Sequence, residues 1–334
     1  MNRGVFMRKS DLDWLVDEFM IYCRSMNLRE KTMSSYEQSL RLFEKWCADE
    51  LNILDADEIT ESVIRRYIND LQSRGKYTFY ANDMSKSKNY PERRRDYRRP
   101  VSTTTINNYI RNIRVFFNWA EREGTVRKNP VQRIRLLKNS RKGKLFFGDE
   151  ELKKLFSKFD KSYFSEHRDY AMIMLMLDSG MRLGECSTLL VSDLMIARKR
   201  INIREEETKG RKGRTVFFSP KTENILRRWI QFKDRYVESE YLFPVKEHGG
   251  SIGVGNFENN FKKYIQRAGL NEEYTPHCLR NNFAKRCLMN GMDIFTLSKI
   301  LGHSSVEVTE QAYLDLSDDD ISRCYQRSSP LSGF

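Results

Sequence analysis

The chain has 334 residues, enough for about two domains, and it is 39% hydrophobic and 31% charged, as expected of a soluble protein with packed cores. Its formal net charge of +13 favours a polyanionic partner. The six cysteines form no Cys-x-x-Cys pair and no long apolar run opens the chain, so we expect a reduced intracellular protein without a signal peptide or membrane span.

The first 124 residues predict four helices from the spacing of their apolar side chains. Helical stripes run through residues 12–20, 36–47 and 59–71, and a fourth helix begins near Ser102 and ends near Gly124. Thr60 is placed to cap the third helix. The many aromatic residues of these stripes are expected in a core rather than in ligand contacts.

Residues 77–100 interrupt this pattern with a polar, basic and tyrosine-rich insertion that has no helical period. It contains the run Arg93, Arg94 and Arg95. Two interpretations stay open: a solvated loop, which charge runs usually form, or an arm that contacts DNA phosphates without sequence preference.

A basic linker follows at residues 127–146. Between Arg127 and Lys144 it carries eight lysines and arginines and no acidic residue. A linker that lies across a DNA backbone is the interpretation we favour. The DNA-contacting side chains expected here are Arg133, Arg135, Lys138, Arg141, Lys142 and Lys144.

The second half of the chain alternates helices with one predicted β-hairpin. An apolar helix over 170–177 ends at Ser179-Gly180 and is followed closely by Arg182 and Glu185. Residues 201–206 and 214–218 are predicted strands. The turn between these strands carries the cations Lys209, Arg211 and Lys212. We expect His167, at the start of the apolar helix, to lie on the surface.

Three further helices are predicted between residues 274 and 316. The first begins at Pro276, where His277 and Arg280 share one face three residues apart. A helix N-terminus already attracts anions, so these two side chains predict a phosphate site. The second helix ends at Gly302, directly before His303, and Tyr313 lies in the third.

The order of these motifs resembles that of the tyrosine recombinase (integrase) family. An arginine box at 180–185, a hairpin lysine, a His-x-x-Arg box at 277–280, Gly302-His303 and Tyr313 follow one another with family-like spacing. The resemblance covers residues 147–316 well and 11–130 more loosely. One departure is Asn281-Asn282, where the family commonly has histidine and a small hydroxyl residue, and we expect these two residues to support the reacting groups rather than to take part in the chemistry.

The resemblance implies a nucleophilic tyrosine and a pair of arginines that hold the phosphate. Tyr313 would attack a DNA phosphodiester and form a 3′-phosphotyrosine, leaving a free 5′ hydroxyl. A phenol, with a pKa of about 10, is a better leaving group than a sugar alcohol when the strand is rejoined. Arg182 and Arg280 would bind the non-bridging oxygens through their guanidinium forks. Tyr325 is the rival nucleophile.

Four further residues are implied in supporting roles. His277 would act as an acid or base or as an oxyanion donor, and His303 would hydrogen-bond the phosphate. Lys209 aligns with the family's hairpin lysine, which protonates the departing 5′ oxygen, and Lys212 is the alternative. Glu185 would orient a neighbouring base or arginine rather than react.

The resemblance also implies a mainly α fold with a small β-hairpin or sheet in the catalytic domain, built as a two-domain DNA clamp. We expect a helical core-type DNA-binding domain at 1–126, the linker at 127–146 and an α+β catalytic domain at 147–316. The tail at 317–334 is a candidate for exchange between protomers.

The resemblance also implies a partner and a function for the protein. The expected partner is double-stranded DNA with specific recombination sites, bound by a tetramer at synapsis in the bacterial cytoplasm, with accessory proteins left open. No metal, cofactor or ATP is implied. Integration or transposition of a mobile element is favoured, because the insertion at 77–100 departs from the minimal Xer-like layout. The alternatives are Xer-like chromosome dimer resolution, a type IB topoisomerase and a non-catalytic helix-turn-helix regulator.

Overall fold

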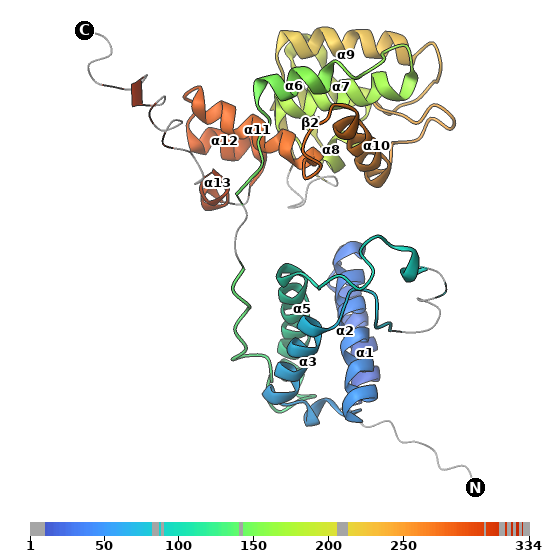
Figure 1. Cartoon of the computed structure of the whole chain (residues 1–334), viewed down its shortest axis with the longest axis vertical. Coiled ribbons are helices and arrows are strands. Elements are labelled where there is room, and N and C mark those ends of the chain that lie inside the picture. The colour runs from blue at the N-terminus through green and yellow to red at the C-terminus, as the bar shows by residue number, and fades with distance from the viewer. Residues whose placement is uncertain are drawn as a thin grey trace. The chain divides into compact units, whose positions relative to one another are not determined.

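The structure is a computed structural model that describes residues 11–81, 87, 90–139, 143–205, 213–303 and 305–313, and the single tail residues 318, 322, 325, 326 and 329. For Val308 and residues 311–313 it describes the backbone alone. The described chain is mainly helical with one small three-stranded sheet (Figure 1), which confirms the expected fold class. It divides into two compact units, residues 1–141 and 142–334.

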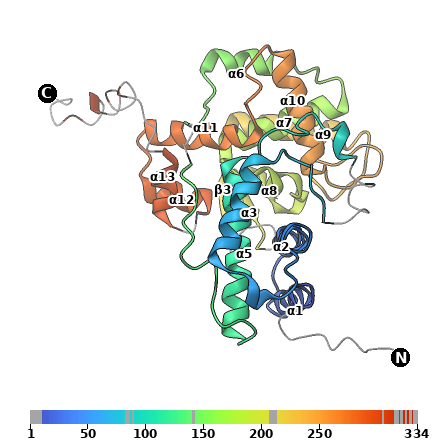
Figure 2. The same cartoon turned by 60° about the horizontal axis from the view of Figure 1, so that its bottom comes forward.

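The first unit is a bundle of helices (Figure 2). The expected N-cap of the third predicted helix is present, because Thr60 Oγ1 accepts the Val63 N–H at 3.4 Å. Ser102, near which the fourth helix was predicted to begin, also acts as an N-cap, and its Oγ accepts the Thr105 N–H at 3.2 Å. The elements are α1 (Leu12–Ser25), α2 (Glu30–Leu51), α3 (Glu61–Ser73) and α5 (Thr103–Arg122), with 3-10 turns at Ala56–Glu58 and Pro91–Arg93.

The aromatic stripes of these helices form the core of the first unit, as the sequence predicts. The Phe19 ring meets Phe116 edge-on with centroids 5.5 Å apart. Val131 and Ile134, which lie in the predicted linker, are buried in the same core. The Asn107 side chain also holds the main chain of Leu137 through hydrogen bonds of 3.0 and 2.8 Å. The first part of the predicted linker is therefore packed on this unit rather than free.

The insertion at 77–100 is anchored at its base. Gly75 and Pro100 form an antiparallel bridge, and the Lys76 N–H donates to Arg99 O at 2.8 Å. A Cβ at Gly75 would lie 2.6 Å from Arg98 Cα, so the two backbones approach more closely than any side chain allows. The described residues at both ends of the insertion are thus held together.

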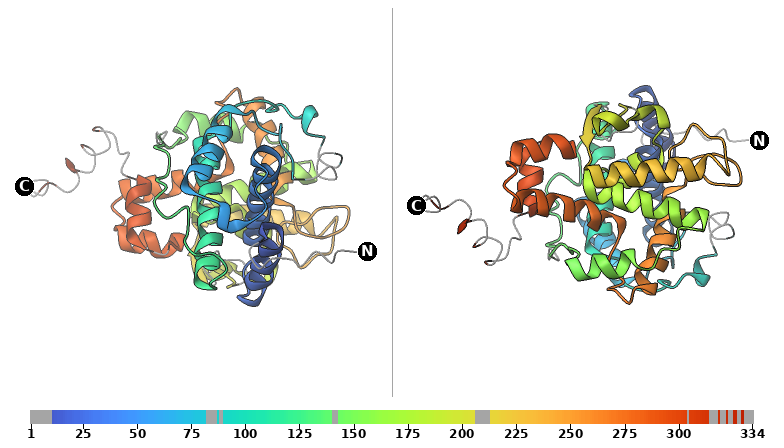
Figure 3. Two further views of the ribbon diagram at one scale, coloured as in Figure 1. Left: turned by 90° about the horizontal axis from the view of Figure 1, so that it is seen from below. Right: turned by 90° about the horizontal axis from the view of Figure 1, so that it is seen from above.

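The second unit places a small antiparallel sheet beside a set of helices. The sheet has the order β1-β2-β3, with Ile201 of β2 opposite Val216 of β3. Figure 3 shows α7 (green) and α9 (yellow) side by side, with the orange-red helices α11, α12 and α13 grouped at one end of this unit. The elements are α6 (Asp149–Phe156), α7 (Phe164–Ser179), α8 (Leu183–Ser187), β1 (Leu194–Met195), β2 (Arg200–Ile203), β3 (Arg214–Phe217), α9 (Pro220–Lys233), α10 (Val254–Arg267), α11 (Pro276–Met289), α12 (Ile294–Leu301) and α13 (Val306–Tyr313), with 3-10 turns at Val191–Asp193 and Ile196–Arg198.

Helix α7 is the centre of the second core, and it corrects one prediction. His167 was expected on the surface but is only 9% exposed, with its ring centroid 4.7 Å from that of Phe232 and 5.4 Å from that of Trp229. The reason is that α7 is buried on nearly every side, so its polar residues are enclosed with the apolar ones. Burial, and then the charge of Lys161, lower the pKa of His167.

Among the helices of the described residues, none combines the length and the apolar character that a bilayer crossing requires.

Candidate active site

The turn after α7 presents Arg182. Gly180 ends α7 with φ +67°, and a Cβ there would lie 2.3 Å from the Phe283 ring, so only glycine fits. Arg182 then caps α8, where its N–H donates to Glu185 Oε2 at 2.8 Å and its Nη1 donates to Glu185 Oε1 at 2.9 Å. Glu185 is 2% exposed, so a buried carboxylate orients an arginine that remains partly accessible.

Arg280 reaches the same region from α11. It is 3% exposed, and its Nη1 donates to Gly180 O at 2.7 Å while its Nη2 donates to Leu301 O at 2.8 Å. Arg182 Nη2 lies 3.3 Å from Gly302 O. Both guanidinium groups therefore converge on the short segment 301–303 that follows α12.

His303 stands at the end of that segment. Its Nε2 lies 3.0 Å from Arg280 Nη2 and its Nδ1 lies 2.6 Å from Thr309 Oγ1 on α13. Burial, followed by the positive charges of Arg280, Arg182, Lys144 and Arg214, lowers the pKa of His303 to about 4. The ring is consequently neutral near pH 7.

His277 lies in the first turn of α11, after the N-terminal Pro276. Its side chain is exposed but borders a recess of about 280 Å³, which is also lined by Arg182 and Arg280. The surrounding protein still reduces its hydration, and this effect and then the charges of Arg280, Lys144 and Arg182 lower the pKa of His277. Glu258 and several apolar residues complete the lining, so the positive charge of the recess comes from the two arginines. Two arginines at a helix N-terminus are suited to an anion such as phosphate.

The structure thus brings together five of the predicted site residues: Arg182, Glu185, His277, Arg280 and His303. Tyr313 is the last residue of α13, and its side chain lies outside the described part. Lys209, Arg211, Lys212, Arg141 and Lys142 lie outside the described residues altogether. Tyr325, the rival nucleophile, is 62% exposed.

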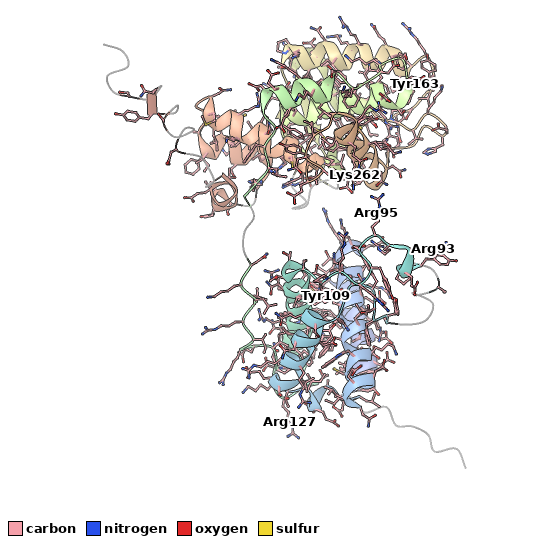
Figure 4. All side chains as sticks on the ribbon, viewed as in Figure 1. Arg93, Arg95, Tyr109, Arg127, Tyr163 and Lys262 are labelled. Atoms are coloured by element: carbon pink, nitrogen blue, oxygen red, sulfur yellow. The ribbon has the colours of Figure 1, made fainter. Side chains whose placement is uncertain are left out.

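The predicted DNA-contacting residues that the structure describes lie mostly on the surface. Arg93, Arg94, Arg95, Arg133, Arg135 and Lys138 are exposed, and Lys144 is half-buried. Figure 4 shows the Arg93 and Arg95 side chains projecting outward from the insertion of the first unit. Their exposure is compatible with binding to DNA phosphates.

Sequence reasoning placed Asn282 behind the reacting groups but missed Thr309 and Arg214, which also support the site. Asn282 accepts the Phe147 N–H at 2.7 Å and donates to Phe147 O at 3.1 Å, which gives the departure from the family pattern a structural role. Thr309 is fully buried against His303. Arg214 pairs with Glu185. Of the two missed residues, only Arg214 had a signal, because strand alternation with the apolar Val216 and Phe218 places it on the inward face.

Metal ligands do not gather in the parts of the chain that the structure describes: these contain no group of three or more histidine, cysteine or acidic residues that could hold an ion.

Comparisons with known proteins confirm the resemblance seen in the motifs. Residues 146–320 match the model of the phage integrase family, and residues 15–140 match the phage integrase SAM-like domain. The chain is 30% identical over 240 residues to tyrosine recombinase XerC of Oceanobacillus iheyensis, covering 70% of this chain and 77% of that protein. It is 26% identical to tyrosine recombinase XerD of Lacticaseibacillus casei, covering 95% and 98%.

Solved structures show the same fold at low identity. The Tn1549 transposon integrase in complex with transposon right end DNA matches with a TM-score of 0.70 and 18% identity, covering 95% of this chain and 99% of that chain. A lambda integrase dimer bound to a COC′ core site matches with a TM-score of 0.65 and 15% identity, covering 90% and 95%.

Proposed function

The chain belongs to the phage integrase family, and we propose that it is a site-specific recombinase that cleaves and rejoins double-stranded DNA through a 3′-phosphotyrosine on Tyr313. The observation that carries this proposal is the convergence of Arg182 and Arg280 on the segment that holds His303. Two fixed guanidinium groups beside a cationic recess provide the charge that a phosphodiester in reaction requires.

In the proposed reaction, the Tyr313 hydroxyl attacks the phosphorus atom and a new bond forms from the phenolic oxygen to the 3′ phosphate. The bond from phosphorus to the 5′ oxygen breaks, and Lys209 supplies the proton to this leaving group. His277, whose lowered pKa keeps it neutral near pH 7, accepts the phenolic proton. The reverse sequence, with a different 5′ hydroxyl as the attacking group, rejoins the strands without ATP.

In this proposal the arginines stabilise the negative charge that develops while the phosphodiester is being cleaved. The pentavalent transition state gathers negative charge on its non-bridging oxygens, and Arg182 and Arg280 are proposed to bind them. Because Glu185 and backbone carbonyls already hold both forks in place, little reorganisation is needed when the charge appears. His303 completes the phosphate contacts in this proposal.

For the biological role, we propose integration or transposition of a mobile element, carried out by a tetramer at synapsis in the bacterial cytoplasm. The insertion at 77–100 adds cations to the first unit and departs from the minimal Xer-like layout, and this departure supports a mobile-element role. Xer-like resolution of chromosome dimers is the second candidate, since the XerD relative aligns over 95% of the chain. Sequencing the DNA that becomes covalently attached to the protein in cells separates the two roles.

The central test uses Tyr313→Phe and Tyr325→Phe on a labelled suicide substrate, analysed on denaturing gels. We expect wild type and Tyr325→Phe to form a covalent adduct, and Tyr313→Phe to bind the same DNA in native gels without forming one. An adduct that persists in Tyr313→Phe and disappears in Tyr325→Phe would transfer the nucleophile to Tyr325. Relaxation of a plasmid that lacks recombination sites would instead favour a topoisomerase.

A further inference from the structure

Arg214, the first residue of β3, is bound on three sides by the candidate site. Its Nη1 donates to Glu185 Oε1 at 2.8 Å, and its Nη2 donates to Glu185 Oε2 at 2.7 Å. Its Nε donates to Ile300 O at 2.9 Å, in the last turn of α12. The side chain is 9% exposed, so this guanidinium is a buried fork rather than a surface charge.

Glu185 is shared between Arg214 and Arg182. Each carboxylate oxygen accepts one hydrogen bond from the Arg214 fork and one from Arg182. Burial by itself would raise the pKa of Glu185, but the hydrogen bonds and charge of Arg214, and then those of Arg182, hold it below its usual value. Arg214 therefore keeps ionised the carboxylate that orients Arg182.

Arg214 also supports the segment that carries His303. A Cβ at Gly302 would lie 2.8 Å from Arg214 Cδ and 3.0 Å from its Nε, so the arginine stem packs directly against this glycine. The carbonyl of Gly302 faces Arg182 Nη2 at 3.3 Å. The same side chain thus limits the positions of Arg182 on one side and of residues 300–302 on the other.

We propose that Arg214 is a positioning residue for DNA cleavage, which sets the orientation of Arg182 through Glu185 and the position of His303 through Ile300 and Gly302. It touches no reacting atom. The proposal rests on the proposed recombinase function, because it assigns a role within that reaction. A purely structural ion pair would stabilise the unit without favouring one orientation of Arg182, and this difference can be measured.

The variant that isolates this role is Arg214→Lys. Lysine keeps the positive charge but cannot offer two parallel donors to Glu185 and a third to Ile300 O. At saturating DNA we expect single-turnover cleavage to fall about ten- to a hundredfold, the range caused by misplacing a catalytic group by about an ångström. DNA affinity should change by less than about twofold, since Arg214 is buried away from solvent.

The matched control is Arg227→Lys. Arg227 also pairs with a glutamate, donating from Nε and Nη2 to Glu223 Oε1 at 3.0 and 2.9 Å, but this pair lies on α9 with the Arg227 side chain 49% exposed. We expect Arg227→Lys to cleave at the wild-type rate. It controls for the loss of a guanidinium fork from an Arg–Glu pair elsewhere in the same unit.

A double-mutant cycle with Arg182→Ala distinguishes positioning from a merely structural role by comparing the loss of cleavage rate in two backgrounds. If Arg214 acts mainly by orienting Arg182, then Arg214→Lys should slow cleavage much less in the Arg182→Ala background than in wild type. Equal losses in both backgrounds would overturn the orientation of Arg182 by Arg214, and wild-type cleavage by Arg214→Lys would overturn the proposal as a whole. Thermal unfolding of each protein ensures that only folded variants are compared.

A replacement variant covers the case of misfolding, and failure of the proposed function can be distinguished from failure of this inference. If Arg214→Lys does not fold, Arg214→Gln takes its place in the same cycle with the same expectations, because its single amide group cannot reproduce the two-donor contact with Glu185 and the bond to Ile300 O. If wild type forms no adduct that depends on Tyr313, the proposed function fails and this inference falls with it. An adduct formed normally by wild type and by Arg214→Lys refutes the positioning role alone.

Discussion

Arg280 Nη2 lies 3.0 Å from His303 Nε2, and this contact selects one form of the imidazole. A guanidinium can only donate, so Nε2 must accept and the ring proton must be on Nδ1. That proton points to Thr309 Oγ1 at 2.6 Å. Thr309 lies one helical turn before Tyr313 on α13, so the hydrogen bond connects the phosphate site to the helix of the proposed nucleophile.

The same geometry constrains how His303 can bind DNA. In the arrangement observed, Nε2 accepts from Arg280 and has no proton to donate. A hydrogen bond from Nε2 to a phosphate oxygen would therefore require His303 to gain or transfer a proton and Arg280 to turn toward the phosphate. An incoming phosphate, whose negative charge raises the pKa of a nearby histidine, favours that change.

Thr309→Val tests this connection with a side chain of similar shape. Thr309 is fully buried, so valine would leave the Nδ1–H of His303 without its acceptor, at a cost of about 1–3 kcal/mol. We expect a lower melting temperature, restored by Thr309→Ser, while nitrogen-15 NMR shows the same His303 tautomer, because Arg280 still requires Nε2 to accept. A melting temperature equal to that of wild type would show that the hydrogen bond to Thr309 does not stabilise the fold.

The depressed pKa of His303 predicts how stability depends on pH. The folded value is about 4, against about 6.5 in the unfolded chain, so the unfolded state binds more protons between these values. Stability is fully present above about pH 6.5 and is lost as the pH falls toward 4. The melting temperature of His303→Gln should fall less over this interval than that of wild type. His248→Gln, on an exposed loop, is the control and should behave like wild type.

The two arginines should respond differently to substitution by lysine. Both Arg182→Lys and Arg280→Lys should lose about 3 kcal/mol of transition-state stabilisation, about a hundredfold in rate, because lysine lacks the fork. Arg280→Lys should also unfold at a lower temperature, since Arg280 is 3% exposed whereas the Arg182 side chain is 30% exposed. Near-native cleavage on gels by either variant would remove that residue from the site.

The insertion arginines can be tested through salt dependence. Arg95 is exposed, and Arg93 lies with its guanidinium 4.8 Å from the centroid of the Tyr90 ring. If both contact phosphates, Arg93→Ala with Arg95→Ala should weaken DNA binding for all sequences and reduce the slope of log K against log salt by about two. Lys45→Ala, which removes a cation paired with Asp49 on α2, is the control. An unchanged slope would favour the solvated loop.

Chelation tests the proposed charge neutralisation. Because the guanidinium groups of Arg182 and Arg280 are assigned the stabilisation of the phosphate oxygens, we expect cleavage in EDTA to equal cleavage without it. A strict requirement for a divalent cation in the same gel assay would point to a different class of enzyme.

The elements and the order of the site motifs could be predicted from the sequence, because they depend on short-range signals. Apolar spacing located the helices α1, α3 and α5, Thr60 caps its helix as predicted, and α5 begins directly after Ser102, where the sequence places its start. Gly180 and Gly302 were identifiable as helix ends, and both adopt positive φ. Each of these features is decided within one or two helical turns.

The connections within the site were decided only by the tertiary structure. Glu185 and Arg214 are 29 residues apart, and Arg280 bonds to Gly180 across 100 residues, so neither contact follows from local periodicity. His167 was wrongly predicted at the surface, because the sequence around it does not reveal how many neighbours enclose α7. Residue type determines that a charged or polar side chain needs a partner when it is buried, but only packing determines which partner it meets.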